Sequence, residues 1–281
     1  MKSTIYVVGG DLRQITVAES LRKEGFTVST VGLSEKDDCD IKELKNAEVI
    51  VLPIPVSYDN VYINTPLSKE RLVISEVLDN LQADCFVLGA CISGEIEKML
   101  TDRRLEYCDY FRREELIIKN AIPTAEGTIE IALSEMPITL FKSRALVLGY
   151  GRVGKVMADR LLGMGADVTV SARKCADFAW IEENRMKAIH TGDLIFKADK
   201  FDLIINTIPA VVLTEDVLER VRSDTLIIDL ASKPGGVDFN IAKKLGKNVI
   251  WALSLPGKSA PITSGNIIKE TIVNILAETG V

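Results

Sequence analysis

The sequence predicts an α/β protein with two domains, each built on a doubly wound parallel sheet. Three observations favour this class. Short apolar runs rich in β-branched residues recur along the chain, stretches of helical period separate many of them, and the rhythm starts again beyond residue 140. Parallel strands joined by helices need cover on both faces of their sheet, and this alternation supplies it. A chain of 281 residues is long enough for two such domains.

The first half carries five short apolar runs, which we interpret as strands. They cover residues 4–8, 27–31, 49–52, 86–88 and 105–107. Helical patterns over Leu12–Lys23 and Lys69–Leu81 lie between them. Five strands of this kind are typical of a flavodoxin-like domain, to which we assign residues 1–122.

The segment that follows has a different character and is predicted to connect the halves. Pro123–Gly127 is expected to be a loop that opens into a helix over Thr128–Met136, which Pro137 ends. Loop composition places interdomain hinges near residues 120–127 and 256–262.

The second half repeats the alternation more clearly and predicts six strands. They cover residues 145–148, 168–172, 187–190, 203–206, 226–229 and 249–253. Six is the strand count of a complete dinucleotide-binding Rossmann fold, which we assign to residues 123–262. Ser264–Glu278 is an amphipathic helix, and we expect residues 263–281 to pack back onto the first domain.

The clearest motif is Gly-x-Gly-x-x-Gly, formed by Gly149, Gly151 and Gly154 after a predicted strand and before a predicted helix. In this fingerprint the first glycine allows a tight turn, the second lets the backbone approach a pyrophosphate, and the third lets the helix pack closely. Arg152 and Val153 then lie in the first helical turn, whose unpaired N–H groups attract phosphates. The alternative is a glycine-rich turn without a ligand, but the surrounding strand and helix pattern favours a dinucleotide site.

The end of the second strand in this domain predicts NADP rather than NAD. Chains that bind NAD usually place an acidic residue about 20 positions beyond the first glycine, where it binds the ribose 2′-OH. Here residues 169–174 contain no acid. Ser171 can donate a hydrogen bond, and Arg173 and Lys174 can pair with a 2′-phosphate. The alternative is that both cations belong to a solvated turn.

Thr207, Ile208 and Pro209 follow the fourth strand of the same domain. Ligands of open α/β sheets bind outside the carboxyl ends of the strands, so these residues are candidates for facing the cofactor. A plain turn explains the same tetrapeptide equally well.

Polar loops elsewhere supply candidates for binding and converting a substrate. Asp11 suits a helix N-cap, and Arg13 in the first helical turn opposes the helix dipole, which favours a task of holding an anion. Thr124 is interpreted either as a helix cap or as a site residue. Glu126 is a candidate general acid or base, or simply a residue that suits a helix start.

Two further loops follow the fifth and sixth strands of the second domain. Ser232 and Lys233 can bind a carboxylate, and Lys233 can transfer a proton if burial lowers its pKa. Lys258 lies in a loop that two prolines are expected to make rigid, and it is a further cation for the same cleft. Surface turns and a hinge with a solvated lysine are the alternatives.

The remaining reactive residues favour structural roles. His190 is the sole histidine, at the end of a predicted strand, where a histidine is more often structural than catalytic. Cys91 follows a strand and precedes a helix without a partner in sequence, and we interpret it as a buried structural cysteine.

Bulk composition narrows the functional class. A net charge of −6 argues against nucleic acid as a partner, and no apolar run approaches the roughly 20 residues that span a bilayer. The five cysteines lack Cys-x-x-Cys spacing, which argues against a disulfide framework or a metal site. The N-terminus lacks the pattern of a signal peptide. We therefore expect a cytoplasmic protein.

Taken together, these motifs resemble the dipicolinate synthase A-subunit family. The resemblance lies in Gly-Gly-Asp-Leu-Arg-Gln at 9–14, Pro-Thr-Ala-Glu-Gly at 123–127, Gly-Tyr-Gly-Arg-Val-Gly at 149–154, Asp-Leu-Ala-Ser-Lys-Pro-Gly-Gly-Val-Asp at 229–238 and Leu-Pro-Gly-Lys at 255–258. It extends over essentially the whole chain, with the 9–14 and 229–238 stretches as its specific parts.

The resemblance implies an activity and partners. It implies NADP-dependent oxidation of a dihydrodipicolinate-type intermediate of lysine biosynthesis to dipicolinate, in the mother cell of a sporulating bacterium. It also implies a hetero-oligomer with the flavoprotein-like dipicolinate synthase B-subunit, and we expect self-association as well. The implied arrangement of domains is that of alanine dehydrogenase and the 2-hydroxy-acid dehydrogenases, with the first domain holding a small dicarboxylate substrate.

Two other functions stay open at this stage. One is a different NADP-linked dehydrogenase for an amino or hydroxy acid. Residues 251–261 contain no histidine, which disfavours 2-hydroxy-acid chemistry but leaves lysine-based, alanine dehydrogenase-like chemistry. The other is an NADP-binding component without catalysis, since a fold does not imply an activity.

Overall fold

The computed structural model describes residues 3–34 and 38–280. The chain divides into two compact units. Unit 1 comprises Met1–Asn120 and Ala260–Val281, and unit 2 comprises Ala121–Ser259.

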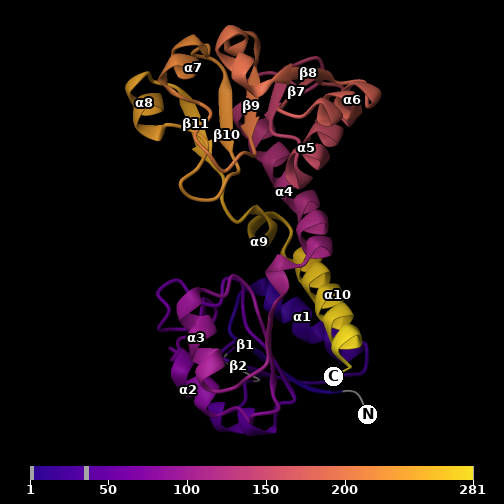
Figure 1. Ribbon diagram of the computed structural model, residues 1–281, viewed down its shortest axis with the longest axis vertical. Coiled ribbons are helices and arrows are strands. Elements are labelled where there is room, and N and C mark those ends of the chain that lie inside the picture. Colours follow the sequence, from indigo (N-terminus) through magenta and orange to yellow (C-terminus); the bar gives the residue numbers. More distant parts are fainter. Residues whose placement is uncertain (1–2, 35–37, 281) are drawn as a thin grey trace. The chain divides into compact units, whose positions relative to one another are not determined.

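Unit 1, in which Figure 1 labels strands β1 and β2, contains a parallel five-stranded sheet in the order β2-β1-β3-β4-β5. The strands are β1 (Thr4–Val8), β2 (Thr27–Val31), β3 (Val49–Val51), β4 (Phe86–Gly89) and β5 (Tyr107–Asp109). This is the flavodoxin-like order. The helices are α1 (Leu12–Lys23), α2 (Ile74–Asp79) and α3 (Gly94–Asp102), with short 3₁₀ turns η1 (Ile41–Asn46) and η2 (Tyr110–Arg112). A separate apolar core lies on each face of the sheet, because alternate strand residues point to opposite sides.

The C-terminal helix α10 (Pro261–Thr279) packs on α1 within unit 1. Gly265 permits the close approach, since a Cβ there would lie 2.6 Å from the backbone oxygen of Arg13. The Ser20 hydroxyl donates to Asn266 across this contact at 2.9 Å. The apolar stripe of α10 thereby completes one core of the unit 1 sheet.

Unit 2 contains a parallel six-stranded sheet in the order β8-β7-β6-β9-β10-β11, the Rossmann order 3-2-1-4-5-6 (Figure 1). The strands are β6 (Arg144–Leu148), β7 (Asp167–Ala172), β8 (Lys187–His190), β9 (Leu203–Asn206), β10 (Leu226–Asp229) and β11 (Asn248–Trp251). The helices are α5 (Arg152–Gly163), α6 (Cys175–Glu183), α7 (Glu215–Arg220), α8 (Phe239–Lys244) and α9 (Leu255–Ser259), with 3₁₀ turns η3 (Thr191–Phe196) and η4 (Ala198–Lys200).

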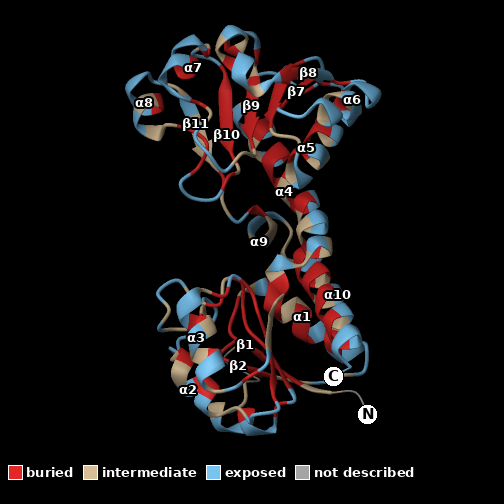
Figure 2. Cartoon of the chain, viewed as in Figure 1, coloured by how far each residue is buried: buried red, intermediate tan, exposed pale blue. Residues whose placement is uncertain are grey.

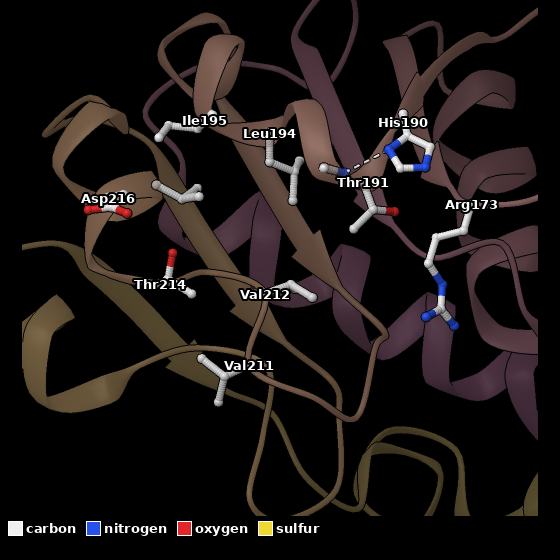
Figure 3. Close-up of a pocket in the computed structure, with 11 residues that line it drawn as sticks. Arg173, His190, Thr191, Leu194, Ile195, Val211, Val212, Thr214 and Asp216 are labelled. Atoms are coloured by element: carbon white, nitrogen blue, oxygen red, sulfur yellow. Dashed lines mark hydrogen bonds between the residues drawn. The ribbon is translucent and has the colours of Figure 1, made fainter.

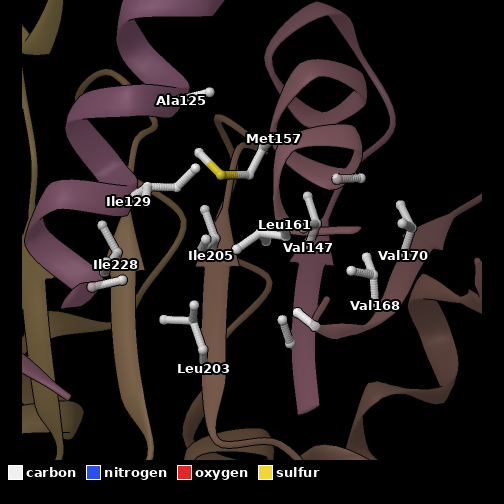
Figure 4. Packing of buried hydrophobic residues seen from close by; sticks show 14 of the residues in the cluster. Ala125, Ile129, Val147, Met157, Leu161, Val168, Val170, Leu203, Ile205 and Ile228 are labelled. Atoms are coloured by element: carbon white, nitrogen blue, oxygen red, sulfur yellow. The ribbon is translucent and has the colours of Figure 1, made fainter. Parts of the chain in front are cut away.

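Burial explains why these strands form a central sheet. The middle of each sheet is almost wholly buried, while the helices outside it carry many exposed residues (Figure 2). On one face of the unit 2 sheet, strand residues interlock with two helices, as Figure 4 shows for Ala125, Ile129, Val147, Met157, Leu161, Ile205 and Ile228. Parallel strands buried on both faces are nearly continuous apolar runs, which is the pattern of this sequence.

The predicted loop at Pro123–Gly127 is wrong, because helix α4 (Glu114–Glu135) runs straight through it with Pro123 inside. Leu116, Ala121, Ala125 and Ile129 are all buried along this helix, so an apolar stripe continues across the proline. Proline removes one helical hydrogen bond at a cost of about 3 kcal/mol, and this continuous burial offsets it.

Two other predicted segments differ from the structure. The helix expected over Lys69–Leu81 shrinks to α2, because Ile63 and Leu72 are joined by a backbone hydrogen bond of 2.9 Å that holds the preceding residues in an irregular connection. The rigid loop expected around Lys258 is instead the short helix α9, which is followed by Pro261 at the first position of α10. Proline at this position suits a helix start.

Candidate functional site

The turn between β6 and α5 gives each of its three glycines a different role. Gly149 has φ +94°, and a Cβ there would lie 2.8 Å from the Thr207 hydroxyl. At Gly154 a Cβ would lie 2.1 Å from the backbone oxygen of Gly149, so only glycine lets α5 approach the turn. At Gly151 a Cβ would meet nothing within 4 Å, so the backbone there faces open space. These are the roles that the dinucleotide fingerprint requires.

Gly151 also stands at the N-cap of α5, with an extended backbone and no side chain to cap the helix. Arg152 and Val153 form the first helical turn behind it. The N–H groups of this turn therefore meet the open space next to Gly151, where an anionic group gains from both hydrogen bonds and the helix dipole.

Thr207 fixes the neighbouring strand end rather than facing outward. Its hydroxyl and its backbone N–H both donate to the Leu148 oxygen, at 2.8 and 3.0 Å, and so tie β9 to the end of β6. Ile208 is half-buried against Gly149, and Pro209 is exposed. Thr207 and Ile208 thus shape the glycine turn from beneath, which is a positioning role.

A cavity of about 410 Å³ opens at the carboxyl ends of β7, β8 and β9 (Figure 3). Apolar side chains form much of its wall, among them Leu194 and Ile195 of η3 and Val211 and Val212 beyond β9. Arg173 and Thr191 add polar groups. An apolar cleft with a few polar groups at its margin is the usual form of a small-molecule site.

Arg173 is an exposed cation at this cavity, and its guanidinium makes no hydrogen bond or ion pair within residues 3–34 and 38–280. Lys174 beside it is exposed and stands at the N-cap of α6. Both cations are therefore available to an anionic group of a ligand.

Ser171 is not available in this way. It is fully buried, and its hydroxyl accepts a long hydrogen bond of 3.4 Å from Thr191. Strand β7 pairs with a strand on each side and is covered on both faces. The side chain of Ser171, its penultimate residue, therefore points into the protein rather than toward the cavity. The interpretation of Ser171 as a ligand of the cofactor is therefore corrected.

His190 lines the cavity but serves the backbone. Its Nδ1 accepts from the Gly192 N–H at 3.1 Å, which caps η3 (Figure 3). Its ring meets Phe178 edge to face at 6.4 Å between centroids. These contacts fit the structural role that the sequence favours.

Asp229 is a site residue whose role the sequence did not reveal. It is fully buried at the end of β10, where its carboxylate accepts from the Asn206 amide at 2.8 Å and from the N–H groups of Ala231 and Gly236 at 3.0 and 2.8 Å. Gly236 is required there, since a Cβ would lie 2.0 Å from the Asn206 nitrogen. The signal in the sequence was an acid at a strand end followed by Gly-Gly, a pattern in which a carboxylate collects the N–H groups of a tight loop.

The loop that Asp229 holds carries two exposed candidates, Ser232 and Lys233. The backbone oxygen of Ser232 accepts from the Gly235 N–H at 2.8 Å, which closes the turn, and both side chains are exposed. Lys258 is exposed on α9. These side chains are free to meet a ligand and are not committed to the core of unit 2.

The helix α4 changes the roles of Thr124 and Glu126. Thr124 lies in the middle of the helix, so its interpretation as a cap is wrong; its backbone oxygen accepts from the Thr128 hydroxyl at 2.7 Å. Glu126 is exposed on the same helix and so is no helix-start residue.

In unit 1 the anion that Arg13 holds is Asp11. The Arg13 Nε donates to both carboxylate oxygens at 2.9 and 3.1 Å, and Nη2 donates to Asp11 at 2.7 Å and to the Ile54 oxygen at 2.9 Å. Asp11 also caps α1 through the Arg13 N–H. Only Nη1 has no partner among the described residues, so an external carboxylate must use that end of the guanidinium.

Cys91 lies near this pair at the end of β4, in a left-handed backbone conformation with φ +56°. Its N–H and that of Ile92 donate to the carboxylate of Asp109, both at 3.2 Å. The residue is exposed, so its interpretation as a buried cysteine is wrong. Desolvation by the protein and the charge of Asp109 nevertheless raise the pKa of its thiol to about 11. Cys91 is therefore a neutral thiol near pH 7 and no activated nucleophile.

Family comparisons agree with this geometry. Residues 4–111 match the model of the N-terminal domain of the dipicolinate synthase A-subunit, and residues 137–243 match a model of NAD(P)-binding domains. The dipicolinate synthase A-subunit of Bacillus subtilis (strain 168) is 34% identical over 98% of this chain and 96% of its own length. The chain belongs to the dipicolinate synthase A-subunit family.

Solved structures give the same result. The crystal structure of the dipicolinate synthase A-subunit from Bacillus halodurans shares 33% identity with a TM-score of 0.92, over 98% of each chain. An L-alanine dehydrogenase structure has a TM-score of 0.70 at 15% identity, over 99% of this chain and 90% of its own, which shows a shared fold alone. The predicted family and the predicted fold class, two parallel-sheet α/β domains of which the second is of the NAD(P)-binding type, are therefore confirmed.

The family and the fold support an oxidoreductase-like role with a nicotinamide cofactor. Among the described residues, no helix combines the length and apolar character needed to cross a membrane.

Proposed function

We propose that this chain oxidises dihydrodipicolinate to dipicolinate with NADP as the hydride acceptor. The observation that carries the proposal is the open backbone at Gly151, together with the unpaired Arg173 at the adjoining Rossmann cavity, in a chain that belongs to the dipicolinate synthase A-subunit family over nearly its whole length.

The cavity and the glycine turn are suited to bind different parts of the dinucleotide. The apolar walls around Leu194 and Val212 suit an adenine ring, and the N–H groups of the first turn of α5 suit the pyrophosphate. Arg173 and Lys174 offer a 2′-phosphate two cations that have no partner among the residues the structure describes, whereas a carboxylate at this strand end would repel it. This arrangement favours NADP over NAD.

The reaction asks the protein to hold a dicarboxylate and to remove a proton. The bound nicotinamide supplies the hydride acceptor. In unit 2, Lys233 and Lys258 are the proposed partners of a substrate carboxylate, with Ser232 and Thr124 as polar contacts. In unit 1, Arg13 offers Nη1 to a carboxylate. Glu126 takes the proton, because Lys233 is exposed and so lacks the burial that would suit a lysine to accept it. Loss of one hydride and one proton converts the dihydro ring to an aromatic one, which supplies much of the driving force, so the protein mainly positions the ring.

We also propose a cellular setting from the family. Together with the dipicolinate synthase B-subunit, the chain forms assemblies that hold further copies of itself, in the cytoplasm of the mother cell during sporulation. Relatives named as dipicolinate synthase A-subunits support the proposed substrate, and the fold supports the proposed hydride transfer to a nicotinamide cofactor.

Titration with NADP and NAD tests the cofactor assignment. Arg173→Ser is expected to weaken NADP binding by about 10- to 150-fold, because a charge-assisted hydrogen bond contributes roughly 1.5–3 kcal/mol, and to leave NAD binding unchanged. Arg220→Ser removes an exposed arginine of the same unit away from the cavity and serves as the control. Equal affinity of the wild type for both cofactors contradicts the assignment.

Turnover of the complex tests catalysis by this chain. Lys233→Met and Glu126→Gln are assayed in the presence of the B-subunit, and Glu126→Gln is expected to lower kcat at least a hundredfold. Unchanged turnover in both variants identifies the chain as an NADP-binding component whose partner carries the chemistry. Turnover of other amino or hydroxy acids by the wild type, without dipicolinate formation, identifies a different dehydrogenase.

A further inference from the structure

A second cavity, of about 300 Å³, lies at the amino ends of strands in the unit 2 sheet. Arg144, Asp167 and Lys187 line it, and they are the first residues of the adjacent parallel strands β6, β7 and β8. The dinucleotide cavity lies at the opposite, carboxyl ends of these strands. The second cavity therefore takes no part in the site described above.

The rim of this cavity carries an excess of positive charge. Four cations line it, namely Arg144, Lys187, Lys197 and Lys200, against one carboxylate, Asp167. Asp167 accepts from Lys187 at 2.6 Å, and Arg144 pairs with Asp202 outside the cavity at 2.7 Å. Four cations against these two carboxylates leave two positive charges unmatched.

Lys197 and Lys200 are the two unmatched cations. Their side chains have no hydrogen bond or ion pair to any residue in the described ranges, and they stand three positions apart in the turns after η3. Two cations held at one opening are suited to a ligand with two negative charges.

The floor of the cavity is apolar except for one hydroxyl. Ile189 and Phe201 are 7% and 5% exposed and line it beside Ala188. Thr169 also lines it, is 7% exposed, and its hydroxyl has no hydrogen-bond partner within residues 3–34 and 38–280. A hydroxyl can donate one hydrogen bond and accept others, so this one is suited to bind a polar group inside the cavity.

We propose that this cavity is a second binding site, which takes a small organic dianion with a flat apolar body. Lys197 and Lys200 bind its two acidic groups, the Thr169 hydroxyl donates to one of them, and Ile189 and Phe201 receive the apolar part. The volume lies at the lower end of the range for small-molecule sites, which limits the ligand to a single ring or a short chain.

One segment joins this site to the dinucleotide cavity. Thr191, Leu194 and Ile195 line the first cavity, and Lys197, Lys200 and Phe201 line the second. A ligand that holds the lysines restrains the wall against which the dinucleotide binds, so each ligand changes the affinity of the other by the same factor.

Calorimetric titration of the full chain with phthalate, a flat aromatic dianion, tests the site. Benzoate, with one charge, and inorganic phosphate, without an apolar body, are the comparison probes. We expect phthalate to bind saturably and at least tenfold more tightly than either, both without NADP and with NADP at saturation.

Variants assign the binding to this cavity. The double variant Lys197→Ala/Lys200→Ala is expected to weaken phthalate binding at least tenfold, because two charge-assisted hydrogen bonds are lost. Thr169→Val keeps the shape and is expected to weaken binding about threefold, the effect of one neutral hydrogen bond. Lys243→Ala/Lys244→Ala removes two exposed lysines of unit 2 away from the cavity and is the control.

Four results would overturn the proposal. These are no saturable binding of phthalate by the wild type, equal binding by the Lys197/Lys200 variant, an equal loss in the control, and complete exclusion of phthalate by NADP. The last result would place the probe in the dinucleotide cavity. Because the site is tested by direct binding, its failure leaves the proposed reaction untouched, and failure of that reaction leaves the site standing.

Discussion

Substituting two glycines of one turn with alanine separates ligand binding from folding. Gly151→Ala adds a methyl group to open space, whereas Gly154→Ala places one 2.1 Å from the Gly149 oxygen. We expect Gly151→Ala to fold normally and bind NADP poorly, and Gly154→Ala to lose both stability and binding.

The magnitudes follow from these contacts. In Gly151→Ala, the methyl group occupies the space that a phosphate oxygen needs to reach the first N–H groups of α5. Loss of one such charge-assisted hydrogen bond costs about 1.5–3 kcal/mol, which weakens NADP binding by about 10- to 150-fold. The extended backbone of Gly151 accepts alanine, and a less favourable N-cap is offset by a stiffer unfolded chain, so the melting temperature shifts by no more than about 4 °C.

In Gly154→Ala the clash is with backbone, so α5 must move away from the turn. Forcing one extra carbon into a packed contact costs about 1–3 kcal/mol or more. Gly163→Ala, where a Cβ meets nothing within 4 Å on the same helix, is the matched control and should match the wild type in binding. Thermal melts and NADP titrations of the three variants provide the test. Wild-type affinity in Gly151→Ala, or wild-type stability in Gly154→Ala, refutes the reasoning.

Three further predictions concern charge and burial. Asp229→Asn puts an amide where a carboxylate accepts three N–H groups, and should lower the free energy of unfolding by about 2 kcal/mol in a denaturant titration; an unchanged midpoint would contradict the loop-holding role. Hydrogen bonds from Arg144 hold the pKa of Asp202 well below its usual range, so the stability that its carboxylate gives the fold is complete above about pH 4 and is lost as the pH falls further. Asp202→Asn should therefore lower the free energy of unfolding at pH 7, and progressively less below about pH 4. A difference in unfolding free energy that stays constant with pH would exclude this linkage. Cys91, with its pKa near 11, should react with iodoacetamide at pH 8 about tenfold or more slowly than a peptide thiol; an equal rate would show an ionised thiol.

Much of the fold follows from sequence because buried parallel strands leave a simple pattern. The apolar runs at Thr4–Val8, Leu203–Asn206 and Leu226–Asp229 coincide with strands β1, β9 and β10. Each is covered on both faces, so its apolar character is continuous and its ends are marked by polar loops. The glycine fingerprint also predicted the turn correctly, since each of its glycines is needed for the local backbone geometry of that one turn.

The errors share one physical origin, which is tertiary packing that overrides local preference. Pro123 marks a break in isolation, but the buried stripe from Leu116 to Ile129 carries the helix through it. Ser171 stands near a strand end, where a solvent-facing hydroxyl is expected, but cover on both faces of β7 buries it. The sequence of strand β7 alone does not indicate which elements cover the face toward which Ser171 points.

Pairing between polar side chains was the feature that could least be predicted from the sequence. Asp11 and Arg13 each suggested a separate role, and the structure joins them into one bidentate pair that leaves only Nη1 open among the described contacts. Asp229 and Asn206 lie 23 residues apart and meet because β9 and β10 are neighbours in the sheet. Such contacts depend on strand order, which the sequence indicates only through the fold class.

Product stoichiometry tests most directly whether this chain carries out NADP-dependent synthesis of dipicolinate. The purified chain receives enzymatically generated dihydrodipicolinate with NADP or NAD, with and without the B-subunit, while reduced cofactor and dipicolinate are both followed. We expect one NADPH for each dipicolinate, formed faster than with NAD. At NADP concentrations below saturation, Gly151→Ala should be slower by about 10- to 150-fold, the loss expected in NADP binding. Tight binding of NADP without dipicolinate in any combination would contradict the proposed reaction.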